Sequence, residues 1–438
     1  MQSKIDAVVI GGGIAGLVSA AYLAGQGKNV KLFEQSSVLG GRARTKEKDG
    51  FLLNLGPHAL YRSKVEMGIL NDLGITLRGK EPSTTGAFAV RRGKKYAFPA
   101  GPISLLTTGL FKFSTRLEVG RVLASLPKVD GRSVVQVTLQ EWVESNISNP
   151  SAREFFLALF RLSTYVNAPD LMSAGVAIEQ LKMALKSNVI YLDGGWQTII
   201  DGLREASIKR GVSIETGAKV DVIERNPDGS VRGVRFADGH TVETPIAIIT
   251  ASPSVAASMI EGGSATSLAR WADESIPVRA ACLDLALKRL PNPKATFALG
   301  LDLPLYLSVH SASAKLAPEG SALIHLAKYL PVDHNHSPEA IERELEDLMD
   351  TVQPGWREVI VYRRFLPDMV VMNRIPSASD SGFEKRPGPQ VPDVAGLYVA
   401  GDWVGNYGLL ADASFASAKQ AAEMAVAYNP AKAMAPAL

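Results

Sequence analysis

The chain has 438 residues, 46% of them hydrophobic, with 47 Lys and Arg against 44 Asp and Glu. A chain of this length buries a large core and divides into two or three domains. The net charge of +3 is too small to indicate nucleic acid as the main partner, and the single cysteine, Cys282, excludes an internal disulfide framework and a multi-cysteine metal site.

The first elements predict a β-α-β unit. Residues 5–10 indicate a buried strand, Ile14 to Gly25 a helix of small residues, and Asn29 to Glu34 a second strand. The opening residues lack the charged, apolar and cleavage regions of a signal peptide, so we expect no secretion signal and a cytoplasmic location. No run approaches the roughly 20 apolar residues that cross a bilayer. We expect a doubly wound parallel sheet to begin here.

Three glycines lie between the first strand and the helix. Gly11 suits a tight turn, Gly13 a close approach of backbone to a pyrophosphate, and Gly16 close packing of helix on strand. The helix that begins at Ile14 then points its N-terminal end at the anion. Glu34 lies 18 residues beyond Gly16, where a carboxylate accepts the hydroxyls of an adenosine ribose. This order predicts a dinucleotide site, and the acid argues against the 2′-phosphate of NADP.

The next part of the chain changes to helical patterns, with helices predicted at Ser63 to Leu73, Ser114 to Ala124 and Ser151 to Thr164. Residues 91–95 form the basic tip of a predicted hairpin, which either binds anionic lipid or an acidic substrate or is a solvated turn. Apolar residues between Pro102 and Leu126 have a loosely helical spacing. They either contact a membrane or bury against the core of this lobe.

The second half returns to the sheet. A helix is predicted at about Trp196 to Arg210, followed by a β-meander and the return strand, with strands at Val212 to Glu215, Lys219 to Asn226, Val231 to Phe236, Thr241 to Glu243 and Ile246 to Ile249. A mixed region from about 268 to 387 precedes a buried strand at Gly396 to Ala400 and a final helix at Asp412 to Tyr428. His334 and His336 lack a third ligand and precede a helix start, so we expect an exposed loop and no metal site.

A second glycine pair follows Glu34, in Leu39-Gly40-Gly41-Arg42-Ala43-Arg44-Thr45, where the arginine suits phosphate or flavin oxygens. With this string the chain resembles the flavin-containing amine oxidase superfamily, which includes phytoene desaturases and protoporphyrinogen oxidases. Gly217-Ala218-Lys219-Val220 and Leu397-Tyr398-Val399-Ala400-Gly401-Asp402 lie in the order of that family.

The resemblance implies an α/β fold with a Rossmann-like, doubly wound FAD-binding sheet, a β-meander and an inserted α+β substrate domain. We expect the FAD-binding domain to comprise residues 1–80, 187–265 and 388–430, and the substrate-binding domain residues 81–186 and 266–387.

The resemblance also implies roles for single residues. Val220 would hold the adenine edge through its backbone, and Asp402 would lie by the pyrophosphate and the ribityl chain. The last helix would begin beneath the flavin, and helix N-termini stabilise negative charge. The predicted cofactor-binding residues are Gly11, Gly13, Ile14, Ala15, Gly16, Glu34, Gln35, Gly41, Arg42, Gly56, Pro57, His58, Val220, Gly401, Asp402, Leu409, Leu410 and Ala411.

Two residues are candidates for catalysis, His58 and Tyr407. Gly56-Pro57-His58 lies where relatives pass beside the isoalloxazine, and the ordinary pKa of histidine suits a donor to the flavin or a base. A hydrogen-bonded structural histidine is the alternative. Tyr407 and Trp403 are candidates for aromatic residues against the flavin, with core packing as the alternative. Cys282 is far from Gly401 in the sequence, so we expect noncovalent FAD.

These expectations describe an FAD-dependent oxidoreductase that removes a hydride from a mostly apolar substrate, desaturase- or dehydrogenase-like, with amine oxidation second. An isomerase that uses reduced flavin without net redox change and a noncatalytic flavoprotein share the same motifs. We expect a small lipophilic substrate as partner and no nucleic acid, and leave peripheral membrane contact as an alternative. The sequence does not give the substrate, the electron acceptor or the oligomeric state.

Overall fold

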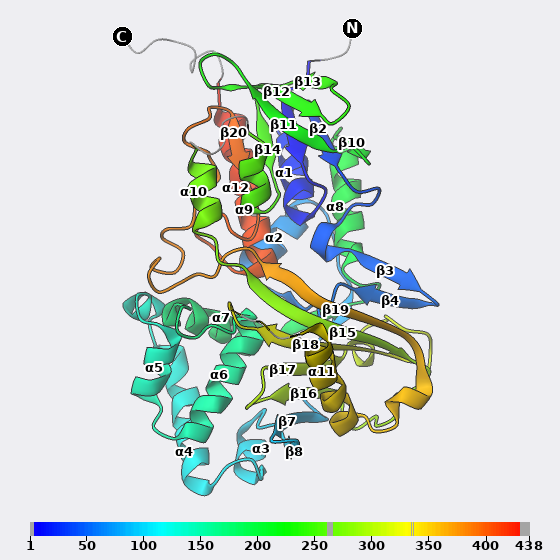
Figure 1. The fold of residues 1–438 in the computed structure, drawn as a ribbon, viewed down its shortest axis with the longest axis vertical. Helices are drawn as coiled ribbons and strands as arrows, with labels where there is room; N and C mark the ends of the chain where they lie inside the picture. The colour runs from blue at the N-terminus through cyan, green and yellow to red at the C-terminus, as the bar shows by residue number, and fades with distance from the viewer. Residues whose placement is uncertain (1–3, 261–265, 334, 336, 430–438) are drawn as a thin grey trace.

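The computed structural model describes residues 4–260, 266–333, 335 and 337–429. Figure 1 shows a parallel sheet with its helices at one end of the long axis and a helical region with a larger mixed sheet at the other. Two long strands, β15 (Val278–Leu287) and β19 (Ile360–Met372), run between the two regions. The predicted class, an α/β fold with a doubly wound sheet and a second α+β region, is confirmed.

The parallel sheet has the order β10-β2-β1-β14-β20. Its strands are β1 (Ala7–Ile10), β2 (Val30–Glu34), β10 (Ser213–Thr216), β14 (Ala247–Ile249) and β20 (Leu397–Val399). Val9 lies opposite Leu32 on one side and Ile248 on the other. Because all neighbours are parallel, the carboxyl ends of β1, β2 and β20 meet at one edge, where ligands bind in sheets of this kind.

Both faces of this sheet are covered, as expected for parallel strands. Alternate residues such as Val9 and Leu32 pack against the helices α1 (Ile14–Gly25), α8 (Gln197–Lys209) and α12 (Leu410–Ala427). The others, such as Val8 and Phe33, pack against the antiparallel meander of β11 (Val220–Arg225), β12 (Val231–Phe236) and β13 (Thr241–Glu243). The predicted β-α-β unit, meander and final helix are confirmed.

A helical region follows the first sheet strands. It comprises α3 (Pro102–Thr107), α4 (Phe113–Ser125), α5 (Leu139–Asn146), α6 (Pro150–Thr164) and α7 (Ala174–Ser187), whereas α2 (Lys64–Asp72) packs with α1 and α12 on the parallel sheet. The apolar run predicted between Pro102 and Leu126 is thus two helices with a break between Thr107 and Phe113. Arg116 on α4 stabilises this break by donating to the carbonyl oxygens of Phe111 and Thr108.

The mixed sheet has the order β19-β15-β18-β17-β16-β7-β8. Besides β15 and β19 it contains β7 (Ala87–Arg91), β8 (Lys94–Ala97), β16 (Phe297–Gly300), β17 (Leu305–Val309) and β18 (Ala322–Leu330). The β7–β8 pair confirms the predicted hairpin. One face of the sheet packs its leucines against α11 (Pro338–Val352). The other face turns toward the parallel-sheet region and carries polar residues.

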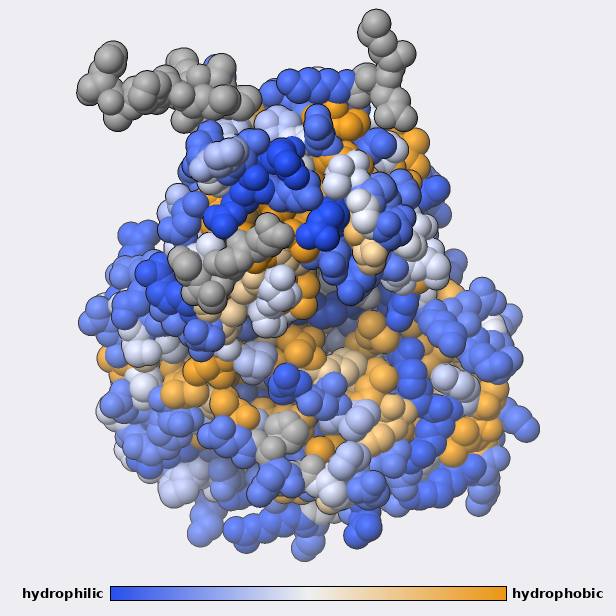
Figure 2. All heavy atoms as spheres, turned by 45° about the horizontal axis from the view of Figure 1, so that its top comes forward, coloured by the Kyte–Doolittle hydropathy of each residue, from blue (hydrophilic) through white to orange (hydrophobic). Residues whose placement is uncertain are grey.

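Short strands join the two regions: β3 (Thr45–Lys48), β4 (Phe51–Asn54), β5 (Leu60–Tyr61), β6 (Gly79–Lys80) and β9 (Val189–Leu192). The helices α9 (Pro253–Ser258) and α10 (Ser267–Asp273) pack with the parallel sheet on its meander side. Within the described residues no helix is long and apolar enough to cross a membrane. In Figure 2 hydrophilic residues cover most of the visible surface, and apolar ones gather across the middle of that face. The domain boundaries stay a prediction, and His334 and His336 lie outside the described residues.

Candidate functional site

The turn between β1 and α1 contains several glycines, whose missing side chains have different consequences. Gly11 has a φ of +108°, and a side chain there would overlap Thr250. A side chain at Gly16 would overlap the carbonyl oxygen of Gly11, so Gly16 allows the helix to pack on the strand. Gly13 differs, because a Cβ there would have Gly40 O as its nearest neighbour, 4.0 Å away. The missing side chain at Gly13 therefore leaves space that the fold itself does not use.

A second glycine turn faces the first. Gly40 N donates to Gly12 O at 2.8 Å, and a Cβ on Gly41 would lie 3.8 Å from Gly13 Cα. Gly13, the N-cap of α1, has no side-chain cap, so the first N–H groups of that helix lack a side-chain acceptor. Space between two side-chain-free turns, at a helix N-terminus, fits a pyrophosphate. Ile14 and Ala15, both predicted to contact the cofactor, form the first turn of this helix.

Arg42 and Asp402 meet at the same edge of the sheet. Arg42 Nη1 lies 2.6 Å from Asp402 Oδ2 and donates to Val371 O at 2.8 Å. Asp402, 2% exposed, also accepts from Asn373 Nδ2 at 2.8 Å. Because Arg42 follows Gly41, this contact joins the second glycine turn to the end of β20 and the end of β19. The structure thus brings Gly13, Arg42 and Asp402 together, as the sequence predicted.

Glu34 is the last residue of β2 and lies beside both glycine turns. Its carboxylate accepts from Gly12 N at 2.6 Å and from Ser36 N at 2.7 Å. A carboxylate has about four acceptor sites, so these contacts leave capacity for the predicted ribose hydroxyls. Ala218 N donates to Glu34 O at 2.9 Å, which brings the start of the meander, with Val220, next to this acid. Gln35 is exposed at the same strand end.

The N-terminus of α12 lies after a loop that buried polar residues hold in place. Arg386 donates to Gly408 O and Val404 O, each at 2.9 Å, and burial lowers its pKa to about 10. Gly401 N donates to Ser417 Oγ at 3.0 Å, which ties β20 to the helix. Leu409, the N-cap, has no side-chain cap, and Leu410 has a φ of +55°. The backbone N–H groups at Leu410 and Ala411 are therefore open to a ligand.

His58 contacts backbone on both sides of its ring. Nδ1 lies 3.1 Å from Gly56 O and Nε2 lies 3.1 Å from Arg42 O, while the ring packs edge-on against Trp196 at 4.9 Å. Burial lowers the pKa of His58 to about 4, outweighing the two carbonyl contacts, which raise it. With this lowered pKa the ring is neutral and carries one N–H, so it donates to one of the two carbonyl oxygens; the geometry favours the alternative of a hydrogen-bonded structural histidine beside the Arg42 and Gly56 turns.

The two aromatic candidates, Trp403 and Tyr407, lie in different surroundings. Trp403 is fully buried in the core under the meander, where its Nε1 donates to Ala251 O at 3.1 Å and its ring packs against Trp271. Of the two alternatives for Trp403, this geometry favours core packing. Tyr407 is 40% exposed, beside Ser63 and Asp412, and burial raises its pKa. Its role stays a prediction.

The Gly56-Pro57 turn packs on the polar-bearing face of the mixed sheet. A Cβ on Gly56 would lie 2.7 Å from Cys282 Sγ, and Tyr165 donates to Pro57 O at 3.3 Å. Cys282 is buried, and burial raises the pKa of its thiol well above the ordinary value. The cysteine distant in sequence is thus close to this turn, with its thiol buried. Tyr329 and Met369 belong to the same apolar cluster.

Sequence reasoning missed Asn373, Ser417 and Arg386, which position Asp402 and the loop that follows it. Their types are common in loops and helices, and the contacts depend on how β19 and α12 approach β20, which no spacing shows. Among the described residues, no group of three or more His, Cys, Asp or Glu side chains is placed to hold a metal ion.

Comparisons with known proteins identify a family that matches most of the chain. The family described as flavin containing amine oxidoreductase matches residues 14–426. The 4,4′-diaponeurosporene oxygenase of Staphylococcus aureus strain USA300 is 26% identical over 273 residues, covering 54% of this chain and 53% of that protein. The chain therefore spans about half the length of the curated relatives it matches.

Solved structures show the same fold. An oxidoreductase from Methanosarcina mazei superposes with a TM-score of 0.75 at 19% identity, covering 96% of this chain and 100% of that chain. A putative protoporphyrinogen oxidase from Exiguobacterium sp. 255-15 superposes with a TM-score of 0.72 at 18% identity, covering 98% and 99%. At these identities the likeness concerns the fold.

Proposed function

The chain belongs to the flavin-containing amine oxidoreductase family, and from that premise we propose that it is an FAD-dependent oxidoreductase acting on a mostly apolar substrate. FAD, when bound, supplies the acceptor for a hydride. The observation that carries the proposal is the meeting of the two glycine turns with the Arg42–Asp402 pair at the carboxyl edge of the parallel sheet.

Different residues of the chain would bind different parts of FAD. Backbone N–H groups at the start of α1 receive the pyrophosphate, and Glu34 receives the ribose hydroxyls. The Arg42 side chain is about half-exposed although one nitrogen is paired with Asp402, so its other N–H groups would bind a second anionic or carbonyl group. The N–H groups at the start of α12 stabilise charge at the other end of the cofactor.

The face of the mixed sheet beside the Gly56 turn supports the proposed class of substrate. The cluster there consists of Ala280, Cys282, Tyr306, Ala327 and Tyr329, with Leu366 and Met369 packed against it. The five core members are each at most 5% exposed, so the region behind the Gly56 turn is apolar and excludes water. This apolar environment supports dehydrogenation of a lipophilic molecule as the reaction. The likeness to a diaponeurosporene oxygenase supports the same reaction class.

Amine oxidation is the second candidate. The rings of Tyr165 and Tyr329 lie 5.6 Å apart at 72°, and Tyr165 donates to the carbonyl of Pro57. Aromatic faces attract cations and orient amines, so this pair favours an amine substrate with an apolar body.

Noncovalent attachment is part of the proposal. Cys282 lies beside the Gly56 turn, but a buried thiol with a raised pKa holds its proton and is a poor nucleophile. Denaturation in acid is therefore expected to release the flavin into the supernatant. A flavin that stays with the precipitated protein would contradict this.

A membrane surface is the proposed source of the substrate. Ile103, Leu106, Phe113 and Leu117 on α3 and α4 are 79%, 55%, 67% and 56% exposed. Exposed Arg92, Lys94 and Lys95 form the tip of the β7–β8 hairpin, at the same end of the molecule (Figure 1). Apolar side chains next to cations are the combination that binds an anionic lipid surface.

One experiment separates the functions. The protein loaded with FAD is mixed anaerobically with candidate isoprenoids and amines, and the flavin absorbance is followed together with product mass. Bleaching with a product lighter by two hydrogens supports oxidation. A product of unchanged mass indicates an isomerase, and a flavin that no candidate reduces indicates a noncatalytic flavoprotein; either result overturns the proposal.

A further inference from the structure

Two buried carboxyl groups meet where α2 packs against the first turn of α12. Glu66 on α2 is 1% exposed, and Asp412, the third residue of α12, is 3% exposed. Ser63, the N-cap of α2, joins them, because its Oγ accepts from Glu66 N at 3.1 Å and donates to Asp412 Oδ1 at 2.7 Å. The two carboxyl groups also hydrogen-bond each other. A carboxylate has no hydrogen to donate, so this last bond requires a proton on one of them.

Glu66 is the group that holds this proton. Its Oε1 is buried without a hydrogen-bond partner, whereas Asp412 accepts from the Ser63 hydroxyl. Burial and the neighbouring Asp412 raise the pKa of Glu66 well above its ordinary value. Burial raises the pKa of Asp412 too, but its bonds to Glu66 and Ser63 reduce that rise, and the positive end of a helix favours a carboxylate in the first turn. The pair therefore carries one proton and one negative charge.

The other titratable groups around the pair are uncharged. Tyr407, in the loop before α12, and Tyr61 on β5 both have a pKa that burial raises, so each phenol keeps its proton. Within the described part of the chain, no Lys, Arg or His is among the groups that shift the pKa of Glu66 or Asp412. Because no cation compensates the charge of the pair, its protonation responds to any further negative charge that enters this region.

The open end of α12 is the place where such a charge would enter. Its N-cap, Leu409, has no side-chain cap, and Leu410 and Ala411 directly precede Asp412 in the same first turn. The N–H groups of this turn are those proposed to stabilise charge at one end of FAD. A carboxylate in that turn opposes an anionic form of the cofactor, and a proton on Asp412 removes the opposition.

We propose that Glu66 and Asp412 form a proton-binding site that takes up one proton when FAD is reduced. The inference rests on the proposed function. Reduction by a hydride donor adds two electrons and one proton to FAD, and hence one negative charge. The proton that the pair takes up comes from water and forms an O–H bond on Asp412, while Glu66 keeps its own proton and no bond of the chain breaks. The pair becomes neutral, so the positive end of α12 acts on the reduced cofactor alone.

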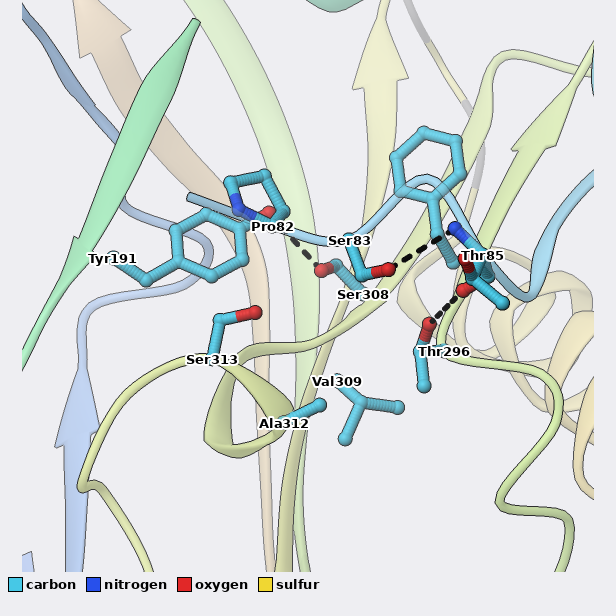
Figure 3. A pocket seen from close by; sticks show the side chains of 10 residues that line it. Pro82, Ser83, Thr85, Tyr191, Thr296, Ser308, Val309, Ala312 and Ser313 are labelled. Carbon is cyan, nitrogen blue, oxygen red and sulfur yellow. Dashed lines mark hydrogen bonds between the residues drawn. The ribbon is translucent and has the colours of Figure 1, made fainter. Parts of the chain in front are cut away.

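The resident proton is tested first, without any reaction. The infrared absorption of protonated carboxyl groups is compared between the FAD-loaded wild type and Glu66→Gln at neutral pH, and we expect the variant to lose the absorption of one such group. Tyr191→Phe is the control. Tyr191 is buried and hydrogen-bonded to Ser308 at 3.1 Å beside a pocket of the mixed sheet (Figure 3), so this variant removes a buried hydroxyl and no carboxyl. Equal carboxyl absorption in the wild type and Glu66→Gln overturns the proposal.

The coupling is tested by the reduction potential of bound FAD, measured with a chemical reductant at pH values between the ordinary pKa of a carboxyl group and that of a tyrosine. For a two-electron couple, each proton taken up changes the ratio of reduced to oxidised flavin about tenfold per pH unit, or about 30 mV. The wild type is expected to take up two protons over the pH range in which Asp412 titrates, a change of about a hundredfold per pH unit. Asp412→Asn is expected to take up only the proton of the flavin, and to favour reduced FAD by on the order of tenfold at higher pH.

Glu339→Gln is the matched control for charge, because Glu339 lies in the first turn of α11, which packs on the mixed sheet. Its potential is expected to equal that of the wild type at every pH. Glu66→Gln replaces Asp412→Asn where the latter does not fold, since Asp412 stays ionised without the neighbouring carboxyl group. Equal slopes in the wild type and Asp412→Asn with FAD bound overturn the coupling alone, as does an equal change in Glu339→Gln. A protein that binds no FAD overturns the coupling and the proposed function together.

Discussion

Substitution of Gly13 separates cofactor binding from folding. Gly13 has φ −82° and ψ −172°, an extended conformation that any residue adopts, and a Cβ there meets no atom closer than 4.0 Å. Gly13→Ala therefore changes the stability of the FAD-free protein by less than about 1 kcal/mol, since a poorer N-cap and a less flexible unfolded chain offset each other.

The same methyl group projects into the space assigned to the pyrophosphate. Overpacking by one methyl costs about 1–3 kcal/mol, which is about 5- to 150-fold in the Kd for FAD. Gly16→Ala is the matched contrast, because its Cβ overlaps Gly11 O within the fold. That variant is expected to lose about 1–3 kcal/mol or more of folding stability before any ligand is added.

Two measurements on each variant check this reasoning: urea denaturation without FAD, and equilibrium titration with FAD followed by flavin fluorescence. Gly13→Ala is expected to unfold like the wild type and to bind FAD weakly. Wild-type affinity in Gly13→Ala would refute the placement of the cofactor between the two glycine turns. A large loss of stability in that variant would refute the open space at Gly13.

Three further predictions concern other residues. Burial and Asp412 raise the pKa of Glu66 well above its ordinary value. The stability that protonated Glu66 contributes is therefore complete below about pH 4.3 and is lost as the pH rises through the raised pKa, at about 1.4 kcal/mol per pKa unit. Glu66→Gln is expected to remove this loss, and a wild-type pH dependence of the variant in urea denaturation at pH 5 and pH 8 would contradict the reasoning. Cys282 is expected to react with a thiol reagent only after unfolding, and rapid reaction of the native protein would contradict its burial. Ile103→Ser with Phe113→Ser is expected to weaken co-sedimentation with vesicles containing anionic lipid while flavin content stays the same, and unchanged sedimentation would remove α3 and α4 from the proposed lipid surface.

Local patterns predicted the elements that build the cofactor edge. The strand, glycines and helix from residue 5 to residue 25 follow from turn chemistry and apolar runs within a short window, and the structure reproduces them. The meander and the final helix were predicted for the same reason, the helix beginning at Leu410, two positions before the predicted Asp412. In such segments the residues that decide the conformation are neighbours in the chain.

A row of polar residues on the mixed sheet, formed by Asp284, His325 and Arg364, was not predicted, because its members come from different strands. They lie far apart in the sequence and meet only through the register of β15 with β18 and β19. A one-residue shift of register would turn each side chain to the other face. Trp403 shows the same limit, since its position after β20 did not reveal that its ring enters the core under the meander.

A crystal structure of the protein with FAD tests the central claim most directly. The account predicts one FAD with its pyrophosphate between Gly13 and Gly41, its ribose at Glu34 and its isoalloxazine between the Gly56 turn and the start of α12. A cofactor bound elsewhere, or an Arg42–Asp402 pair with no contact to it, would contradict the account.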